Sequence, residues 1–444
     1  MVHSTVGKKV PRARGALPVV GHLPTLLRSP LDFLKSLPAQ GDVVRIQTGS
    51  KPAYVVCTPE LTRQVLADDI TYDKGGPIFE KMRRVAGDGI GFCPYAKHRP
   101  QRKMMQPSFS KTRIRTYAEA MSEEVRDHVT SWQAGERVSV PGEMRSLMSK
   151  ITTRVIFGRT DLDREFVDSF DERITQVFQE SFQRALMPAD WLNTIPIRRN
   201  VRYEQEVDEL IAGLIALIEQ RRGSRSDDDQ DLLSSVIDFH EGDDKGLGDQ
   251  LVTLFIGGTG NSAMTLAWSL YLVAKNPHIE AQLHEEVDSV LDGRTARFED
   301  LENLPVVDRV LKETMRLYPS GWNLSRIVTR DTTLGGYELP EGSTVYYSPF
   351  VLHHDPELFP DPERFDPDRW LLDDSTRVRG SYIPFGFGAR KCIGDHFAEV
   401  QMALALASIV RMWNLTSLSP TYVAPVPRVT INPSDFHVRL TPRP

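Results

Sequence analysis

The amino-acid sequence predicts a mainly α-helical protein with a small β region, organised as one large domain. Strand-like segments are few and short, and no internal repeat or low-complexity tract occurs. The polar stretch Arg221–Asp231 is the closest approach to a linker and is too short to separate two domains, so we predict a single domain over residues 1–444. Apolar residues recur at helical spacing in seven segments: Thr112–Gln133, Glu165–Ala185, Tyr203–Arg222, Asp249–Lys275, His278–Leu291, Val306–Leu317 and Gly394–Met412.

The small β region is expected in three places along the chain. The segment His354–Phe387 has no periodicity and contains repeated Pro and Asp, and a loop of that length inside a compact domain is usually functional. The predicted strands are Val43–Thr48 with Ala53–Cys57, Thr333–Tyr337 with Thr344–Tyr347, and a terminal hairpin over Arg428–Leu440.

Charge and cysteine usage exclude several classes of protein. The formal net charge is −6, whereas a nucleic-acid-binding protein usually has a basic balance or a basic stripe. The three cysteines, Cys57, Cys93 and Cys392, are an odd number in a long chain and do not suggest a secreted disulfide scaffold. Residues 1–15 are polar and basic, without the apolar run of a signal peptide or membrane span. We therefore expect a flexible N-terminus, no membrane anchor and a soluble, cytoplasmic protein.

A segment centred on Cys392 carries the strongest chemical signal. It reads Phe385-Gly-Phe-Gly-Ala-Arg-Lys-Cys392-Ile-Gly394 and leads directly into a predicted helix. Glycines let backbone amides approach the sulfur, and a helix N-terminus favours the negative charge of a thiolate. A thiolate bound to haem iron donates electron density that favours O–O cleavage. A lone cysteine is more often a buried structural residue, but the surrounding pattern favours the ligand interpretation.

This segment resembles the haem-binding signature of the cytochrome P-450 family. The resemblance extends over nearly the whole chain and is greatest to soluble bacterial members of actinobacterial secondary metabolism, as at Asp73-Lys-Gly-Gly-Pro77. It implies the cytochrome P-450 fold, in which haem b lies between a distal helix and the helix after the cysteine loop, with Cys392 as the iron ligand. The matching signature positions are Phe385, Gly388, Arg390, Cys392 and Gly394.

Other charged residues match the family as well. The resemblance implies that His98, Arg102, Arg326 and Arg390 pair with the haem propionates, although ordinary solvent exposure is the alternative for each. Glu313-Thr-Met-Arg316 places a carboxylate and a guanidinium on one helix face. An exposed pair of this kind would contribute little to stability. The resemblance implies that Glu313, Arg316 and Arg364 form a buried triad that braces the cysteine loop.

The distal stretch departs from the family pattern. Most relatives have an acid followed by a threonine, whereas this sequence has Gly260 and Asn261. Gly257, Gly258 and Gly260 lower the stability of the helix, so we expect a kink or a close approach of the haem to compensate. Asn261 and Ser262 can form hydrogen bonds but supply no ionisable proton, so we expect protons to reach the bound dioxygen through ordered water or a substrate group. The alternative is that the change is neutral drift in a hydroxylase. The candidate catalytic residues are Gly257, Gly258, Gly260, Asn261 and Ser262.

The resemblance implies an enzyme that uses dioxygen and external electrons to oxidise an apolar small molecule. Hydroxylation of a terpenoid-like skeleton is the first hypothesis. Oxidative C–N or C–C bond formation on an indole or peptide-derived substrate, and a non-oxygenase isomerase or dehydratase, remain alternatives. Substrate contacts are expected in the segments Tyr72–Tyr95, Phe178–Trp191, Val252–Ile256, Pro319–Leu324 and Ile431–Phe436.

No reductase-sized segment remains beside the haem domain, so electrons are expected from a separate ferredoxin and ferredoxin reductase. Basic residues could form the docking patch for an acidic ferredoxin, with ordinary solvated surface as the alternative. These residues are Arg99, Lys103, Arg113, Arg115 and Lys391.

Overall fold

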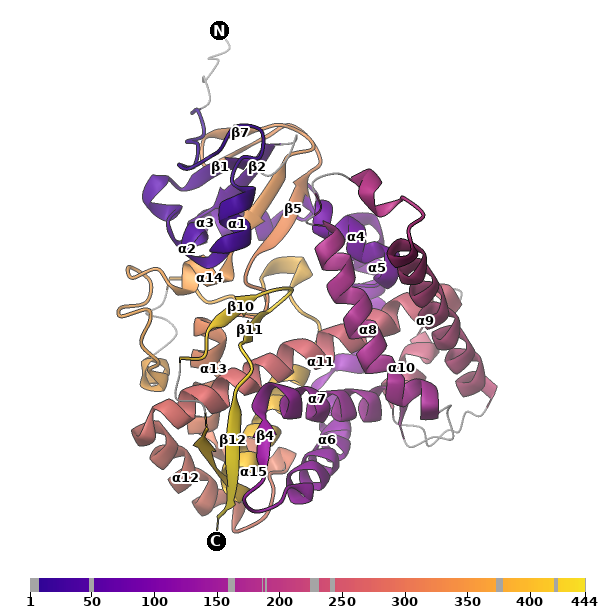
Figure 1. Ribbon diagram of the computed structural model, residues 1–444, viewed down its shortest axis with the longest axis vertical. Helices are drawn as coiled ribbons and strands as arrows, with labels where there is room; N and C mark the ends of the chain where they lie inside the picture. Colours follow the sequence, from indigo (N-terminus) through magenta and orange to yellow (C-terminus); the bar gives the residue numbers. More distant parts are fainter. Residues whose placement is uncertain are drawn as a thin grey trace.

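The computed structural model describes residues 8–47, 52–158, 164–185, 187, 190–223, 231–239, 244–372, 378–418 and 422–443. A body of helices fills the lower and right-hand parts of the view in Figure 1, and a sheet lies beside the N-terminus at the top. The α-helices are α1 (Leu23–Arg28), α2 (Pro30–Lys35), α3 (Pro59–Ala67), α4 (Pro77–Ala86), α5 (Tyr95–Met105), α6 (Lys111–Ser131), α7 (Val140–Phe157), α8 (Arg164–Ala185), α9 (Arg198–Gly223), α10 (Leu232–Phe239), α11 (Asp244–Lys275), α12 (Pro277–Leu291), α13 (Pro305–Leu317), α14 (Pro349–His353) and α15 (Asp395–Met412).

All seven predicted helical segments are helices, namely α6, α8, α9, α11, α12, α13 and α15. The long helix α7 is not among the predicted ones, because Pro141 and Gly142 near its start are typical of a loop. Proline is nevertheless tolerated in the first turn of a helix, where its missing N–H has no intrahelical partner anyway. Ser139 caps this end by accepting a hydrogen bond from the Gly142 amide at 3.4 Å.

The strands form four small sheets. The largest has the order β1-β2-β8-β5-β3, in which β2 and β8 run parallel and the other neighbours antiparallel. The others are β6-β7, β10-β11 and β4-β12-β9. The strands are β1 (Val43–Gln47), β2 (Pro52–Val56), β3 (Tyr72–Asp73), β4 (Arg137–Ser139), β5 (Leu324–Val328), β6 (Thr332–Leu334), β7 (Tyr337–Leu339), β8 (Thr344–Tyr347), β9 (Trp413–Ser417), β10 (Pro425–Pro427), β11 (Ile431–Pro433) and β12 (His437–Pro442).

Two strand predictions are wrong in their pairing. Gly335 and Gly336 both have positive φ and reverse the chain, so the expected strand Thr333–Tyr337 is split into the hairpin β6-β7, and β8 pairs with β2 and β5 instead. The two strands expected to form a terminal hairpin over Arg428–Leu440 likewise belong to two different sheets. Strand β11 pairs with β10, whereas β12 joins β9 and β4 in another sheet.

Residues 8–15, which belong to the segment expected to be flexible, make contacts with the sheet region. The Lys8 amide donates to the carbonyl of Gly336, and the Ala13 amide donates to the carbonyl of Arg45, each at 2.9 Å. The Ala13 side chain is buried. Residues 1–7 lie outside the described part of the chain.

Helix α11 crosses the centre of the helical body (Figure 1) and packs against α7, α9, α13 and α15. It remains helical through Gly257, Gly258 and Gly260. Trp268 in its second half is fully buried, stacks on Tyr318 with ring centroids 3.7 Å apart, and donates from Nε1 to the carbonyl of Ile431. These contacts hold α11 in place from both sides. None of the helices in the described ranges combines the length and the apolar character needed to cross a bilayer.

A fully buried carboxylate, Glu313, links α13 to the segment that precedes the cysteine loop. It accepts two hydrogen bonds from Arg316, at 2.8 and 2.9 Å, and one from Arg369 Nε at 3.2 Å. The Trp370 indole and the Asp366 amide also donate to it, at 3.0 and 3.1 Å. Each of the two carboxylate oxygens therefore accepts at least two hydrogen bonds, as a buried charge requires.

The third member of the predicted triad is therefore Arg369 rather than Arg364. The Arg364 side chain is exposed, and this residue contributes only its carbonyl, which accepts a hydrogen bond from Arg316 Nη2 at 3.0 Å. The 3₁₀ turn Pro367–Leu371 brings Arg369 back toward α13, and sequence spacing does not reveal this reversal.

Replacing these two arginines separately distinguishes the two roles. We expect Arg369→Ala to lower the free energy of unfolding by about 1–3 kcal/mol, because a buried acceptor loses a charged donor. Arg364→Ala keeps the carbonyl contact and should change stability by about 0.5 kcal/mol or less. Urea denaturation of both variants measures the difference, and equal effects would contradict the assignment.

Candidate active site

The cysteine loop is shaped by two glycines and one backbone hydrogen bond. Gly386 and Gly388 have φ of 75° and 74°, and a Cβ on Gly388 would lie 2.3 Å from the carbonyl oxygen of Leu66. The Cys392 amide donates to the carbonyl of Phe385 at 2.9 Å. The loop therefore folds back on itself directly before α15, with Gly394 at the helix N-cap.

The loop is also joined to the buried ion pair through His353. Arg316 Nη1 donates to the His353 carbonyl at 2.8 Å, and His353 Nε2 accepts from the Ile383 amide at 3.0 Å. Because Ile383 lies two residues before Phe385, the Glu313–Arg316 pair is connected to Cys392 by an unbroken series of hydrogen bonds and short peptide segments. These contacts connect the buried ion pair to the cysteine loop, which is the bracing role that the resemblance implies.

Cys392 is surrounded by protein, and its side chain is exposed only to the cavity that it lines. Burial raises the pKa of its thiol, while the Gly394 amide acts in the opposite direction. Burial thus disfavours the thiolate, which binding to a metal ion would stabilise. The other two cysteines, Cys57 and Cys93, are buried and unpaired, and neither lines the cavity.

The cavity has a volume of about 820 Å³ and lies between the cysteine loop and α11. Four of the five predicted contact segments line it, through residues such as Phe92, Phe178, Leu254 and Trp322. The fifth is displaced: the β10-β11 hairpin reaches the cavity through the end of β10 and the start of its turn, Val426–Val429, and not through Ile431–Phe436. The lining is mostly apolar, which suits an apolar ligand with few orienting groups.

Four of the five predicted distal residues, Gly257, Gly258, Asn261 and Ser262, line the cavity. Asn261 Nδ2 lies 3.5 Å from the Gly257 carbonyl. Gly260 lies off the cavity wall. A Cβ on Gly258 would lie 3.1 Å from Thr152 Cγ2, so this glycine permits close packing of α7 on α11.

Ser262 is almost fully buried and is held by a residue that sequence reasoning does not identify. Gln401 of α15 donates from Nε2 to Ser262 Oγ at 2.6 Å and to the Gly258 carbonyl at 2.9 Å. An amide on the helix that follows the cysteine loop therefore binds the distal helix directly. A glutamine within an apolar helical stretch is the only sequence signal for it.

Two hydroxyl groups lie beside Asn261 on the cavity wall. Ser320 Oγ donates to the Asn261 carbonyl at 3.3 Å, and Thr265 Oγ1 donates to the same carbonyl at 3.1 Å. The two hydroxyl oxygens are 3.5 Å apart. The acid of the usual relay is absent, but polar groups remain at this place.

Five basic residues line one end of the cavity: Lys74, His98, Arg102, Arg326 and Arg390. Burial, together with Arg326 and Arg390, lowers the pKa of Lys74 to about 7. Burial, followed by Arg390 and Lys74, lowers the pKa of His98 to about 3. These shifts reflect positive charges gathered away from water, and the cluster favours an anionic ligand. Lys74 is absent from the residues predicted to contact the cofactor, although it stands in the Asp73-Lys-Gly-Gly-Pro77 motif.

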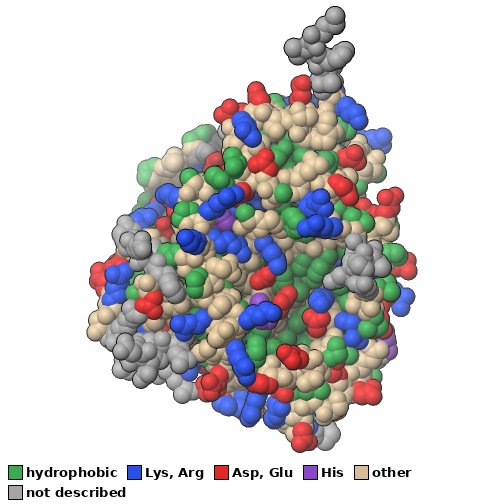
Figure 2. All heavy atoms as spheres, turned by 180° about the vertical axis from the view of Figure 1, so that it is seen from behind, with side chains coloured by type: hydrophobic (Ala, Val, Ile, Leu, Met, Phe, Trp, Pro, Cys, Tyr) green, Lys and Arg blue, Asp and Glu red, His purple; other side chains and the backbone are tan. Residues whose placement is uncertain are grey.

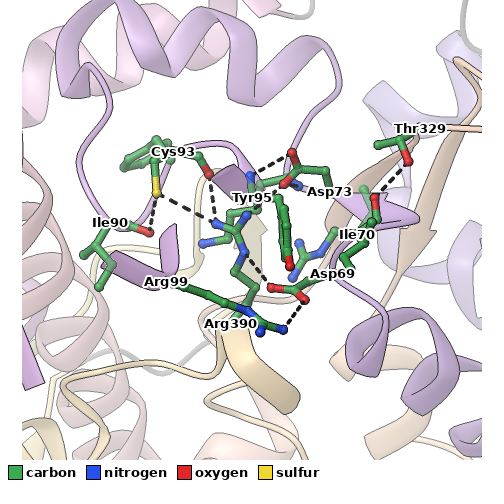
Figure 3. Close-up of polar contacts among 12 residues, drawn as sticks. Asp69, Ile70, Asp73, Ile90, Cys93, Tyr95, Arg99, Thr329 and Arg390 are labelled. Carbon is green, nitrogen blue, oxygen red and sulfur yellow. Dashed lines mark hydrogen bonds and ion pairs between the residues drawn. The ribbon is translucent and has the colours of Figure 1, made fainter. Parts of the chain in front are cut away.

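Arg390 differs from the other four because the protein itself balances its charge (Figure 3). Its guanidinium lies 2.8 Å from Asp73 and 3.6 Å from Asp69, and it donates to the Cys93 carbonyl at 2.8 Å. Asp69 also lies 3.8 Å from Arg99. Arg390 therefore attaches the cysteine loop to the segment around β3, in addition to any contact with a ligand.

Comparisons with known proteins agree with this geometry. The model of the cytochrome P-450 family matches residues 11–434. The chain is similar to cyclooctatin synthase of Streptomyces melanosporofaciens, with 38% identity over 439 residues, 97% of this chain and 95% of that protein. It is 37% identical to pentalenene oxygenase of Streptomyces avermitilis over 438 residues, 97% of each chain. It is also 38% identical to cyclooctat-9-en-7-ol 5-monooxygenase of S. melanosporofaciens over 416 residues, 92% of this chain and 90% of that protein.

A solved structure supports the fold independently. The haem domain of cytochrome P-450DA matches with a TM-score of 0.87 and 23% identity, covering 99% of this chain and 98% of that one. Family members use dioxygen, electrons from redox partners and small-molecule substrates. With a cysteine loop and a distal helix on opposite sides of one cavity, and a family match over most of its length, the chain belongs to the cytochrome P-450 family and is an oxidoreductase whose cofactor is haem b.

Proposed function

We propose that this enzyme hydroxylates a terpenoid-like skeleton in secondary metabolism. The observation that carries the proposal is the mostly apolar cavity that reaches Cys392 and offers only a few polar groups to a substrate. The names of the Streptomyces relatives, which include a pentalenene oxygenase and a cyclooctat-9-en-7-ol monooxygenase, support a terpenoid substrate. The unpaired cysteines agree with a reducing compartment, and we propose the bacterial cytoplasm.

The residues around the cavity fit haem b. Cys392 would supply the thiolate that binds the iron, Lys74, Arg102 and Arg326 would supply positive charge for the two propionates, and His98 would supply an N–H donor. His98 Nδ1 is buried without a hydrogen-bond partner in the described part of the chain, as expected for a donor that awaits a carboxylate. Bound to a cysteine thiolate, haem supplies the activation of dioxygen. The protein holds the cofactor, excludes bulk water and orients the substrate.

For proton delivery we propose a route without an acid. Asn261 faces the cavity, and the Ser320 and Thr265 hydroxyls lie next to it. These groups can hold a water molecule and pass a proton from one oxygen to the next, although none of them is a proton source at neutral pH. Ser262 also lines the cavity; its hydroxyl accepts a hydrogen bond from Gln401 of α15 and keeps its own hydrogen as a donor, so it is a further candidate for the route.

For electron supply we propose a separate ferredoxin and its reductase, which dock on exposed basic residues. Figure 2 shows many Lys and Arg side chains across the middle of the face opposite that of Figure 1, although the whole chain is acidic. Of the five predicted docking residues, Arg99, Arg115 and Lys391 lie within 4 Å of acidic side chains. Arg113 is half-buried, and Lys103 is exposed. An ion pair with an acidic side chain weakens the positive electrostatic field that an acidic ferredoxin would meet. Lys103 is therefore the strongest candidate for a docking contact.

The alternative reactions differ in what they consume. Oxidative C–N or C–C bond formation on an indole or peptide-derived substrate needs reductant and dioxygen but inserts no oxygen. An isomerase or dehydratase needs neither. The apolar lining favours hydroxylation over both alternatives, because it offers few partners to the polar groups of a peptide-derived substrate.

The first experiment combines binding and turnover. We expect terpene hydrocarbons and mono-oxygenated terpenes to shift the Soret band of the ferric enzyme, and reductant, ferredoxin and dioxygen to yield a hydroxylated product. The rate should fall with rising salt, because charged docking is screened. A response to indole or dipeptide ligands alone, or turnover without reductant, would contradict the proposal. A rate independent of salt would contradict the docking site only.

Asn261 can be tested by the efficiency with which dioxygen yields product. We expect Asn261→Ala to lower the product formed per dioxygen consumed by about fivefold, the effect of losing roughly one hydrogen bond. Thr253→Val removes a hydroxyl elsewhere on the cavity-lining part of α11 and serves as the matched control. Unchanged coupling in the Asn261 variant would remove this residue from the route.

Lys74 can be tested by the retention of haem, independently of catalysis. We expect Lys74→Met to speed haem transfer to apomyoglobin by about tenfold, because a propionate loses a charged partner. A bound carboxylate raises the pKa of Lys74 from about 7, so its contribution is complete below that pH and is lost as the pH rises above it. The exposed Lys111→Ala is the control. Equal transfer rates at pH values below 7 would contradict the role.

A further inference from the structure

The segment between α4 and α5, residues 87–93, forms part of the cavity wall, and we call it the wall segment. It reads Gly-Asp-Gly-Ile-Gly-Phe-Cys and belongs to no helix or strand. Ile90, Gly91 and Phe92 line the cavity. A segment without regular structure keeps a fixed position only where other parts of the protein bind its backbone groups.

Two neighbouring residues of α11 bind amides of the wall segment. The Asp88 amide donates to the Asp249 carboxylate at 2.9 Å. The Ile90 amide donates to Gln250 Oε1, also at 2.9 Å. Asp249 is 8% exposed and Gln250 is 1% exposed. Because Ile90 and Gln250 are both buried, an Ile90 amide that lost this acceptor would be left unsatisfied inside the protein.

Glycines allow the wall segment to lie directly on α11. A Cβ on Gly87 would lie 2.1 Å from the Asp249 carboxylate. A Cβ on Gly89 would lie 2.3 Å from the Asp249 carbonyl oxygen. No side chain can therefore stand between the backbone and the helix at these positions, and the backbone comes within hydrogen-bonding distance of α11.

Cationic side chains bind the carbonyl groups at the other end of the wall segment. Lys74 Nζ donates to the Gly91 carbonyl at 2.6 Å. Arg83 Nε of α4 donates to the Phe92 carbonyl at 2.8 Å. The next carbonyl, that of Cys93, is bound by the cysteine loop (Figure 3). Both N–H and C=O groups of the segment are thus held by side chains from several distant parts of the chain.

Phe92 connects the wall segment to the aromatic side chains of two helices. Its ring centroid lies 6.0 Å from that of Phe79 on α4, and 5.8 Å from that of Phe178 on α8 in an edge-to-face arrangement. All three rings line the cavity. Aromatic pairs at these separations attract each other, so a displacement of Phe92 would disturb the whole row.

We propose that Asp249 and Gln250 are positioning residues that hold the wall segment rigid, and that the rigid wall selects substrates by their shape. A preformed wall binds a ligand that fits it without further ordering. A ligand that needs the wall to move must break buried hydrogen bonds. Neither Asp249 nor Gln250 lines the cavity, so both act on the ligand through the wall segment. The proposal rests on the proposed function only in taking this cavity as the substrate site.

Azole binding to the ferric, haem-loaded enzyme tests the proposal without turnover. Imidazole needs little space beside the iron, whereas clotrimazole carries three aromatic rings on its imidazole and must displace the wall. Gln250→Met nearly keeps the side-chain volume but removes the acceptor of the Ile90 amide. We expect Gln250→Met to bind clotrimazole about tenfold more tightly, the effect of roughly one hydrogen bond, and imidazole with unchanged affinity. Soret titrations measure both affinities.

Two further variants complete the comparison. Gln250→Glu keeps an acceptor and should bind both azoles as the unchanged enzyme does. Gln282→Met makes the same change as the test variant at a half-buried glutamine of α12 that does not line the cavity, and should also leave both affinities unchanged. No gain in clotrimazole affinity in Gln250→Met, an equal gain for imidazole, or an equal gain in Gln282→Met would overturn the proposal.

Amide hydrogen exchange of the unchanged enzyme is a second test, which does not depend on whether a variant folds. We expect the Asp88 and Ile90 amides to exchange at least about a hundredfold more slowly than unprotected amides, because opening of a rigid segment is rare. Exchange at the unprotected rate would overturn the proposal. The azole and exchange measurements use no substrate, so their failure leaves the test of hydroxylation, which measures product, unaffected.

Discussion

The fully buried carboxylate of Glu313 is the constraint on which the arrangement around Cys392 depends. A charge without water must receive hydrogen bonds from the protein, and the donors come from α13, from the Asp366 amide and from the 3₁₀ turn that carries Arg369 and Trp370. This requirement fixes the path of a long segment with little regular structure. The same network continues through Arg316 and His353 to the backbone two residues before Phe385. Cys392 is therefore positioned by a polar network rather than by a strand or helix of its own.

The elements that the sequence predicts well are those governed by local rules. Helical periodicity locates α11 and α15, because each buries apolar residues along most of its length. The cysteine loop is predictable because its glycines are required locally, as the close approach of Gly388 to the Leu66 carbonyl demonstrates. Strand pairing depends on distant partners, and β8 therefore pairs with β2 and β5 rather than with its nearest neighbour in sequence.

The same distinction explains the site residues. Arg364 matches a motif, but the reversal of the chain after it presents Arg369 to Glu313. Lys74 precedes two glycines in a loop, and nothing local indicates that it is buried beside Arg326 and Arg390. Conversely, the sequence suggests that Arg390 serves the cofactor, whereas Asp69 and Asp73 balance much of its charge. Residues that act by bringing distant segments together have no local signature.

The bridge formed by Gln401 has a mechanical consequence. Its amide joins the distal helix, which carries Asn261, to the helix that begins directly after Cys392, so the two walls of the active site form one stiff unit. An amide has no titratable proton, and the bridge therefore keeps the same strength at every pH at which the protein is folded. A substrate that displaces α11 near Gly258 would also displace α15, because Gln401 is hydrogen-bonded to the Gly258 carbonyl. Occupancy of the cavity and the position of Cys392 are thus coupled through an uncharged side chain, in addition to the packing of α11 on α15.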